Sequence, residues 1–218
     1  MKQNKSSRST VLLFLLGAAL IVAALIMLVP DLLNYKQSND TYDALKDTYV
    51  SEKPENTEVA EETGGDDSWW YTDVDVNLEE LQQVNADIIG WIRFDNLEQL
   101  SYPVLYSGDD EKYLRTDIYG NQTIAGCIFM EGMNTPDFQD YHTILYGHNM
   151  KNGSIFGTLD SYKKADYWKE HPLVRFYVDG EPRTYEVFAA VETQVLYEDE
   201  DGFRYYRYDG DITEEEYD

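Results

Sequence analysis

The sequence predicts a mainly β domain of barrel type with a few peripheral helices, preceded by one helix that crosses a membrane. Residues 11–29 carry no charge, polar side chain or proline. From residue 91 onward, short runs rich in β-branched and aromatic residues recur between Gly, Asn, Asp and Pro, and few segments have helical spacing. Many short strands with two or three helices are typical of a β-barrel with helical decoration.

The chain begins with a basic tail, residues 1–10, and an apolar segment, residues 11–29. The tail has three cationic side chains and no acidic one. The apolar segment spans about 28 Å as a helix, close to the roughly 30 Å hydrocarbon core of a bilayer. The positive-inside rule then places the tail in the cytoplasm and the rest of the chain outside. A cleaved signal peptide is the competing interpretation, but bulky residues and Pro30 end the segment where a cleavage site needs small ones.

Net charge argues against one class of partner, and the cysteine count shows how the fold must be stabilised. The chain has 17 Lys and Arg against 42 Asp and Glu, a formal net charge of -25. A phosphate backbone would be repelled by this charge, so nucleic-acid binding is excluded. Cys127 is the one cysteine, so an extracellular domain would be held by its own core rather than by an internal disulfide.

Residues 30–75 are predicted to connect the anchor to the domain. Residues 31–50 have weak helical spacing and predict a juxtamembrane helix. Residues 51–68 are acidic, lack aromatic side chains and contain Pro and Gly-Gly, so they predict a flexible stalk. A cluster of three aromatic residues then ends the stalk and is expected to pack the chain onto the domain rather than bind a partner or glycan: Trp69, Trp70 and Tyr71.

The domain is predicted over residues 76–218. Asn77 and Glu80 resemble a capping box in front of a helix over residues 78–86. A second helix is predicted over residues 159–170, and a third from Glu214. Strands are predicted over residues 91–94, 103–106, 124–130, 143–146, 173–178 and 184–196.

The strongest catalytic candidate is His148, in the segment YHTILYGHNMKNGSIFG of residues 141–157. Gly147 ends the predicted strand 143–146, and His148 stands where the chain leaves it. An imidazole at a strand end can enter a cleft while its backbone is held by the sheet, a common placement for a general acid or base. From spacing alone, a structural histidine is the alternative.

The run ILYGHNMKNGSIFGTLDSY resembles the catalytic-histidine segment of class B sortases, the membrane-anchored cysteine transpeptidases of Gram-positive bacteria. The resemblance covers residues 77–191 and implies a sortase β-barrel in which His148 is the catalytic histidine. It implies no cofactor and no metal. Four further blocks carry it in order: NADIIGWIRF (85–94), SYPVLY (101–106), DDEKYL (109–114) and GCIFME (126–131).

The resemblance implies cleavage of a C-terminal sorting signal on secreted proteins and transfer of the acyl group to a peptidoglycan or pilin amine. This chemistry needs a cysteine thiolate, a histidine to protonate the leaving amine and an arginine for the acyl oxygen. The family's TLxTC-type cysteine segment and final-strand arginine have no match here. We therefore expect both beyond Asp218, and the chain as it stands to be inactive. None of the downstream arginines matches the family position: Arg175, Arg183, Arg204 and Arg207.

Other candidate sites are weaker. Cys127 lies in the apolar run AGCIFM, where burial would raise the pKa of the thiol and make it inert. His142, His148 and His171 lack metal-ligand spacing. The acidic runs at 109–111 and 199–201 are predicted as solvated loops rather than sites for Ca²⁺ or a cationic amine.

Two other classes of protein remain as alternatives. A membrane-tethered binding module would grip sorting signals or cell wall without catalysis, and a structural stalk or pilus component explains the YGHNM segment poorly. A barrel that lacks its last strands would have an open edge with unpaired backbone groups. We therefore expect the chain on its own to aggregate or to be degraded.

Overall fold

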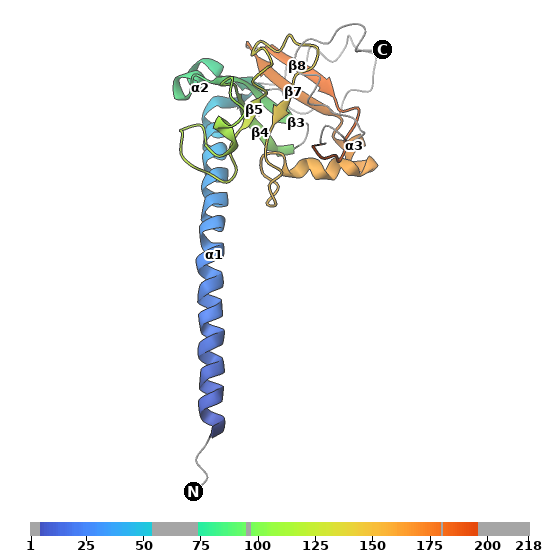
Figure 1. The fold of residues 1–218 in the computed structure, drawn as a ribbon. Helices are drawn as coiled ribbons and strands as arrows, with labels where there is room; N and C mark the ends of the chain where they lie inside the picture. The colour runs from blue at the N-terminus through green and yellow to red at the C-terminus, as the bar shows by residue number, and fades with distance from the viewer. Residues whose placement is uncertain (1–4, 54–73, 95–96, 180, 196–218) are drawn as a thin grey trace.

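The computed structural model describes residues 5–53, 74–94, 97–179 and 181–195, with a long helix carrying a curled sheet (Figure 1). Helix α1 (Lys5–Tyr49) runs through Pro30, where the sequence suggested a break between an anchor and a juxtamembrane helix. Proline removes one backbone donor and crowds the preceding turn. In a helix of 45 residues the many remaining hydrogen bonds outweigh this local loss.

The last turns of α1 belong to the hydrophobic core of the domain. Tyr42 and Leu45 are buried, and the Tyr42 hydroxyl donates to the Gly126 carbonyl at 2.7 Å. Strand β1 (Val50–Glu52) follows directly and pairs antiparallel with β2 (Val74–Val76). The predicted stalk therefore begins as a paired strand, in which Ser51 and Glu52 lie opposite Asp75 and Val74. The rest of that stalk and the aromatic cluster at 69–71 lie outside the described residues.

Helix α2 (Leu78–Val84) begins where the capping box predicted. The Asn77 side chain accepts the Glu80 backbone N–H at 3.2 Å. The helix ends two residues before the predicted end because Asn85 is extended. Its side chain instead accepts the Asp87 N–H at 2.9 Å and donates to the Ile118 carbonyl at 2.9 Å.

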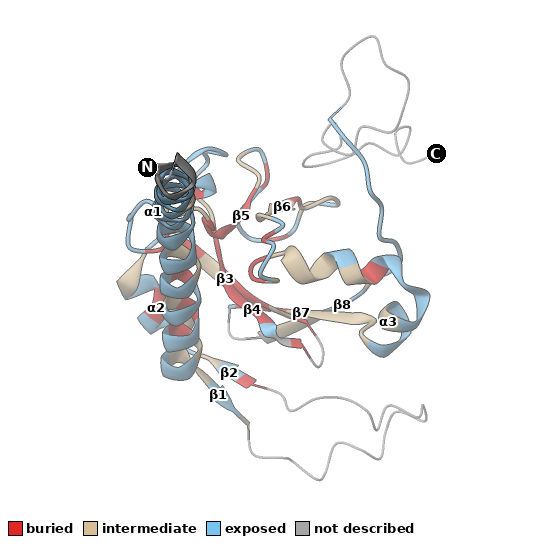
Figure 2. Ribbon diagram, turned by 90° about the horizontal axis from the view of Figure 1, so that it is seen from below, coloured by how far each residue is buried: buried red, intermediate tan, exposed pale blue. Residues whose placement is uncertain are grey.

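Six strands form one sheet in the order β6-β5-β4-β3-β7-β8. Neighbours are antiparallel except β4 and β5, which are parallel. Buried residues concentrate on the inner strands (Figure 2), where the fully buried Trp91 indole donates to the Ser101 hydroxyl at 2.9 Å. The strands are β3 (Ile88–Phe94), β4 (Leu97–Leu105), β5 (Ile128–Met130), β6 (Leu145–Tyr146), β7 (Leu173–Val178) and β8 (Glu181–Glu186).

Most of the predicted elements have different bounds in the structure. The strands predicted over 91–94 and 103–106 begin earlier, as β3 and β4, and only Leu145 and Tyr146 of the strand predicted over 143–146 form β6. The start of the strand predicted over 124–130 is a loop, since Gly126 has a φ of +58° and the Cys127 N–H donates to the Tyr113 carbonyl. The strand predicted over 184–196 runs instead over Glu181–Glu186, and residues 188–195 beyond it are exposed. The helix predicted over 159–170 is divided into the 3-10 helix η2 (Gly157–Lys163) and helix α3 (Ala165–Glu170), because Lys164 between them is extended.

Strand β7 has the bounds that the sequence predicted. The helix predicted from Glu214 lies outside the described residues.

Candidate active site

His148 lies two residues after β6, in a loop that closes on itself. The Phe156 N–H donates to the His148 carbonyl at 3.1 Å, and Asn149 forms an antiparallel bridge with Ile155. We refer to residues 147–157 as the His148 loop. The sheet fixes one end of this loop and η2 begins at the other, so the imidazole is carried on a supported backbone.

Two glycines allow the His148 loop to close. A Cβ atom on Gly147 would lie 2.7 Å from Cδ2 of Phe156, and one on Gly157 would lie 2.1 Å from the carbonyl oxygen of Met150. Both distances are shorter than real carbon contacts. The spacing of glycines around the histidine in this segment is therefore explained by close packing within the loop.

The loop is also tied to the core. The Ile155 N–H donates to the Tyr102 hydroxyl at 3.0 Å. Ile155 is fully buried although its φ of 54° is unfavourable for a β-branched residue. Burial raises the pKa of the Tyr102 hydroxyl, so it stays neutral and keeps its place in this contact. The Asn149 amide donates to Asp160 of η2 at 3.1 Å, so the loop is fixed on two sides.

The imidazole of His148 has a defined hydrogen bond. Its Nε2 atom lies 2.8 Å from the carbonyl oxygen of Leu114. A carbonyl oxygen can only accept, so Nε2 carries the proton in this contact. In the neutral ring Nδ1 is then the basic nitrogen, and the partly exposed ring can exchange protons through that atom.

Two cavities flank the His148 loop. One of about 540 Å³ is bounded by Asn149 and Phe156 of the loop, by Val174 of β7 and by residues 187–191. The other, of about 330 Å³, lies between residues 152–154 of the loop and the polar side chains of α1. The first is lined largely by apolar side chains and the second by polar ones. The loop thus has accessible space beside it on two sides.

Cys127 is buried, as the sequence predicted. Only 1% of its surface is exposed, and its thiol donates to the Thr116 carbonyl at 3.3 Å. Burial raises the pKa of the thiol to about 12, against a smaller opposing effect of the hydrogen bond with Tyr42. The thiolate, which is the nucleophilic form, is therefore scarce at neutral pH.

The other histidines lie apart from His148. The His142 carbonyl accepts the Asn134 side-chain amide at 2.8 Å, and the His171 ring packs on Tyr167 with centroids 4.5 Å apart. Within the described part of the chain, no group of three His, Cys, Asp or Glu side chains could hold a metal ion.

The structure describes two of the four downstream arginines and one of the two acidic runs that the sequence analysis considered. Arg175 lies in β7, and Arg183 in β8 donates to the Phe138 carbonyl at 3.0 Å. In the run at 109–111, Asp110 accepts the Gly132 N–H at 2.6 Å, so this exposed turn also ties two loops together. Arg204, Arg207 and the run at 199–201 lie outside the described residues.

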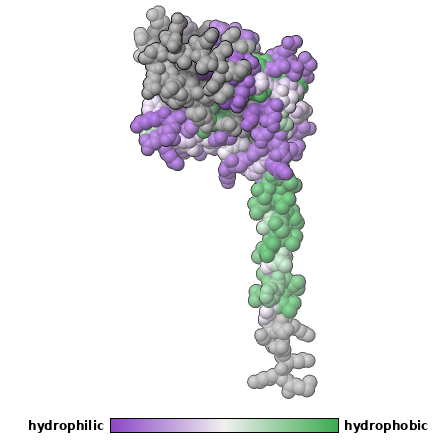
Figure 3. Space-filling model, turned by 180° about the vertical axis from the view of Figure 1, so that it is seen from behind, coloured by the Kyte–Doolittle hydropathy of each residue, from purple (hydrophilic) through white to green (hydrophobic). Residues whose placement is uncertain are grey.

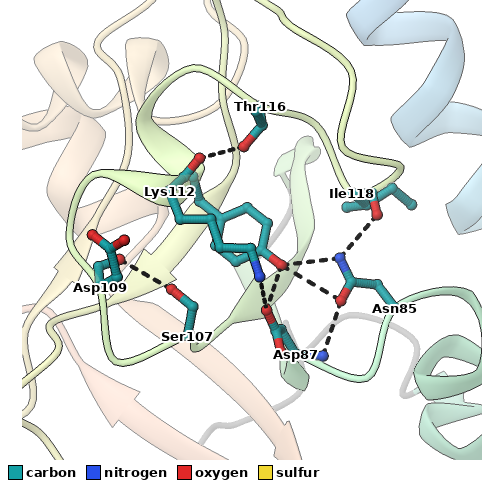
Figure 4. A network of polar contacts seen from close by, with 8 residues as sticks. Asn85, Asp87, Ser107, Asp109, Lys112, Thr116 and Ile118 are labelled. Atoms are coloured by element: carbon teal, nitrogen blue, oxygen red, sulfur yellow. Dashed lines mark hydrogen bonds and ion pairs between the residues drawn. The ribbon is translucent and has the colours of Figure 1, made fainter.

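Sequence reasoning missed a polar cluster beside the turn that carries Leu114 (Figure 4). The Asp87 carboxylate accepts the Lys112 amine at 2.5 Å and the Tyr113 hydroxyl at 2.7 Å, and the Asn85 amide donates to Tyr113 at 3.0 Å. Burial alone would raise the pKa of Asp87, but the hydrogen bonds from Lys112 and Tyr113 outweigh it and lower the pKa. These residues stand in two of the blocks, NADIIGWIRF and DDEKYL, that accompany the histidine segment.

Comparison with known proteins finds chains that are similar in sequence. No family model matches the sequence. Sortase B of Listeria monocytogenes is 38% identical over 116 residues, and sortase B of Staphylococcus aureus is 33% identical over 118 residues. Each match covers 53% of this chain and 47% of the relative, so the chain spans about half the length of the curated relatives it matches.

A solved structure supports the same likeness. Sortase B from B. anthracis, in complex with AAEK1, is 25% identical with a TM-score of 0.57, over 76% of this chain and 75% of that chain. The shared architecture is a strongly curled half-barrel of strands with helices around it. The fold class predicted from the sequence is thereby confirmed.

Proposed function

Because the chain is a homologue of sortase B in sequence and in fold, we propose that it carries the histidine-bearing part of a cysteine transpeptidase. Its substrates are secreted proteins with a C-terminal sorting signal, and its acceptor is a cell-wall or pilin amine. The observation that carries this proposal is the placement of His148. Its ring lies outside the core, on a supported loop, with one nitrogen held by the Leu114 carbonyl.

The proposed chemistry uses His148 twice. A thiolate attacks the scissile carbonyl, and the tetrahedral intermediate collapses as the C–N bond breaks and the leaving amine takes a proton from His148. Leu114 holds Nε2–H, so the proton comes from Nδ1 of the imidazolium. The incoming amine then attacks the thioester carbonyl and gives a proton to the same nitrogen, and the C–S bond breaks to release the product amide and regenerate the thiolate.

The thiolate in this proposal is not that of Cys127. Its burial and its raised pKa make Cys127 a structural residue. The family resemblance implies a separate cysteine nucleophile and an arginine that binds the acyl oxygen, and neither has a match in residues 1–218. Residues 1–218 alone are then expected to bind a sorting signal weakly at best and not to cleave it.

The apolar part of α1 is assigned as the membrane anchor. It is long and apolar enough to cross a bilayer, and none of its most apolar window is buried. Figure 3 shows the corresponding hydrophobic shaft below a hydrophilic domain. A signal sequence would share the length and composition, but continuity of α1 into the core at Tyr42 and Leu45 supports an uncleaved helix. The domain then lies on the outer side of the membrane.

The proposal is tested on the protein that the complete gene encodes, purified in detergent. Turnover is measured with a quenched fluorogenic peptide that contains a Thr–Gly bond, with hydroxylamine as the acceptor. His148→Ala is expected to lower kcat/KM by about 100- to 10,000-fold, whereas Cys127→Ala keeps the activity of the parent.

Two outcomes would count against this assignment. If folded His148→Ala kept full activity, His148 would not be the general acid. If folded Cys127→Ala lost activity, the buried thiol would be the nucleophile. Binding of the peptide without turnover in the parent protein would instead support a membrane-tethered binding module.

A further inference from the structure

We propose that Asp87, Lys112 and Tyr113 position His148, acting through the backbone carbonyl of Leu114. We call Asp87, Lys112, Tyr113 and their neighbour Asn85 the Asp87 cluster. These are positioning residues and do not touch the reacting atoms. Their effect on catalysis rests on the proposed function, whereas their effect on the imidazole can be tested without any turnover.

The first step is that the Leu114 carbonyl depends on its neighbours for its position. Leu114 ends a single 3-10 turn, η1 (Lys112–Leu114), and its side chain is 38% exposed. The Leu114 N–H donates to the Glu111 carbonyl at 3.2 Å. Such a short turn is weakly held by its own hydrogen bonds. Its position therefore also depends on the side chains of Lys112 and Tyr113 and on a neighbouring loop.

The second step is that both of those residues bind one carboxylate. The Lys112 amine and the Tyr113 hydroxyl meet at Oδ2 of Asp87 (Figure 4). Asp87 is itself fixed just before β3, because its carbonyl accepts the Tyr106 N–H at 2.8 Å. The Tyr113 ring is 2% exposed, so packing and the hydrogen bond act together. The carboxylate thus ties the turn to the sheet.

The third step is that the carbonyl is also limited by the Gly126 loop. A Cβ atom on Gly126 would lie 2.6 Å from the Leu114 carbonyl oxygen and 2.5 Å from that of Tyr113. The next residue, Cys127, donates its N–H to the Tyr113 carbonyl at 3.0 Å. The position of the Leu114 oxygen is therefore set by the Asp87 cluster and by close packing, and this oxygen accepts the hydrogen bond from Nε2 of His148.

These contacts lead to a specific expectation for the imidazole. If the cluster is broken, the Leu114 carbonyl shifts, its hydrogen bond with Nε2 weakens, and the ring can exchange its tautomers. Tyr113→Phe removes only a hydroxyl that lies away from His148, and Asp87→Asn keeps the shape of the side chain. Both variants should change the tautomer of His148 without changing any atom that contacts its ring.

The experiment uses the protein that the complete gene encodes, in detergent micelles with ¹⁵N-labelled histidine, read by long-range ¹H–¹⁵N spectra at neutral pH. The parent should show His148 as the Nε2–H tautomer, and both variants should show a mixture of tautomers. His142 and His171 serve as internal controls and should not change. Tyr106→Phe is the matched control, because it removes a hydroxyl that donates to Gly132 at 3.1 Å.

An unchanged His148 spectrum in both Tyr113→Phe and Asp87→Asn would overturn the proposal. Changes in all three histidines together, in both variants, would show that the cluster serves folding in general and would also overturn it. A change at His148 alone, absent from Tyr106→Phe, would support it.

The catalytic consequence is measured in the protein that the complete gene encodes. Tyr113→Phe should lower kcat by about 10- to 100-fold with little change in KM, because small misplacements of a catalytic group are costly. A tautomer change without any loss of kcat would overturn the catalytic role. Absence of turnover in the parent protein would count against the proposed function, while the spectra would still decide whether the cluster orients the ring.

Discussion

Cys127 and His148 both have side chains suited to catalysis, and both bond to residues 112–116, but their surroundings differ. The Cys127 thiol reaches the Thr116 carbonyl inside the core, next to Tyr42 of α1. The His148 ring reaches the Leu114 carbonyl from a partly exposed loop. The same turn therefore contacts an inert thiol and a usable imidazole. Burial, more than residue type, decides which of the two can react.

The largest expected effect is on the alkylation of Cys127. With a pKa of about 12, roughly one thiol in 10,000 is ionised at pH 8, against about a quarter of ordinary thiols. Iodoacetamide should therefore label native Cys127 about 1,000-fold more slowly than a free thiol, as followed by mass spectrometry. The matched control is a cysteine at the other position, in the double variant Cys127→Ala, His148→Cys, which should be labelled rapidly. Rapid labelling of native Cys127 would show that burial does not make its thiol less reactive than a thiol at position 148.

The next effect is the loss of stability caused by adding a methyl group to a glycine of the His148 loop. Gly157→Ala should lower the free energy of unfolding by about 2 to 3 kcal/mol, because the new methyl group meets the Met150 backbone. Gly147→Ala should cost less, since the atoms that it meets, on Phe156 and Ile155, belong to side chains and lie farther away than the Met150 backbone oxygen. Denaturant titrations followed by tryptophan fluorescence measure both, and labelling of Cys127 should stay slow. Equal losses in the two variants would contradict this account of the loop.

The smallest effect is the pH dependence of the contribution that the Asp87 carboxylate makes to stability. The pKa of Asp87 is lowered in the fold, since the hydrogen bonds from Lys112 and Tyr113 outweigh the effect of burial. Its contribution to stability is therefore complete above the unfolded pKa of about 3.9 and is lost as the pH falls through the folded value.

Asp87→Asn should accordingly cost about 1 kcal/mol at neutral pH, and the difference from the parent should vanish between about pH 4 and pH 2. Thermal melts across this range measure it. Asp166→Asn is the control, because the Asp166 side chain is 94% exposed and should show no such trend. A difference that persists at pH 2 would mean that the asparagine disturbs packing rather than charge.

Much of the fold could be predicted because its signals are local. Strand β7 and the start of α2 follow from residue type, spacing and a cap, and Cys127 could be placed in the core from its apolar neighbours. The extent of the strand predicted over 184–196 could not, because leaving the sheet after Glu186 depends on tertiary contacts that residue patterns do not contain.

Of the candidate site, only the His148 side chain could be predicted from the sequence. His148 stands out by its place between a strand and a glycine-rich loop, but its partner is the Leu114 backbone, and every residue has a carbonyl. The Asp87 cluster joins residues about 25 positions apart, so pattern reasoning within a short window does not bring them together. Family blocks mark these residues without saying what they do.

Because α1 is continuous, it fixes the distance between its apolar segment and the domain that carries the site. Between Val29 and Tyr42 the helix rises about 20 Å, at about 1.5 Å per residue. If the apolar part of α1 crosses the membrane as proposed, this continuous helix holds the domain within a thin layer parallel to the bilayer. Under the proposed function, a substrate would then have to present its scissile bond within that layer, so the distance from that bond to the substrate's own membrane segment would affect which substrates are cleaved.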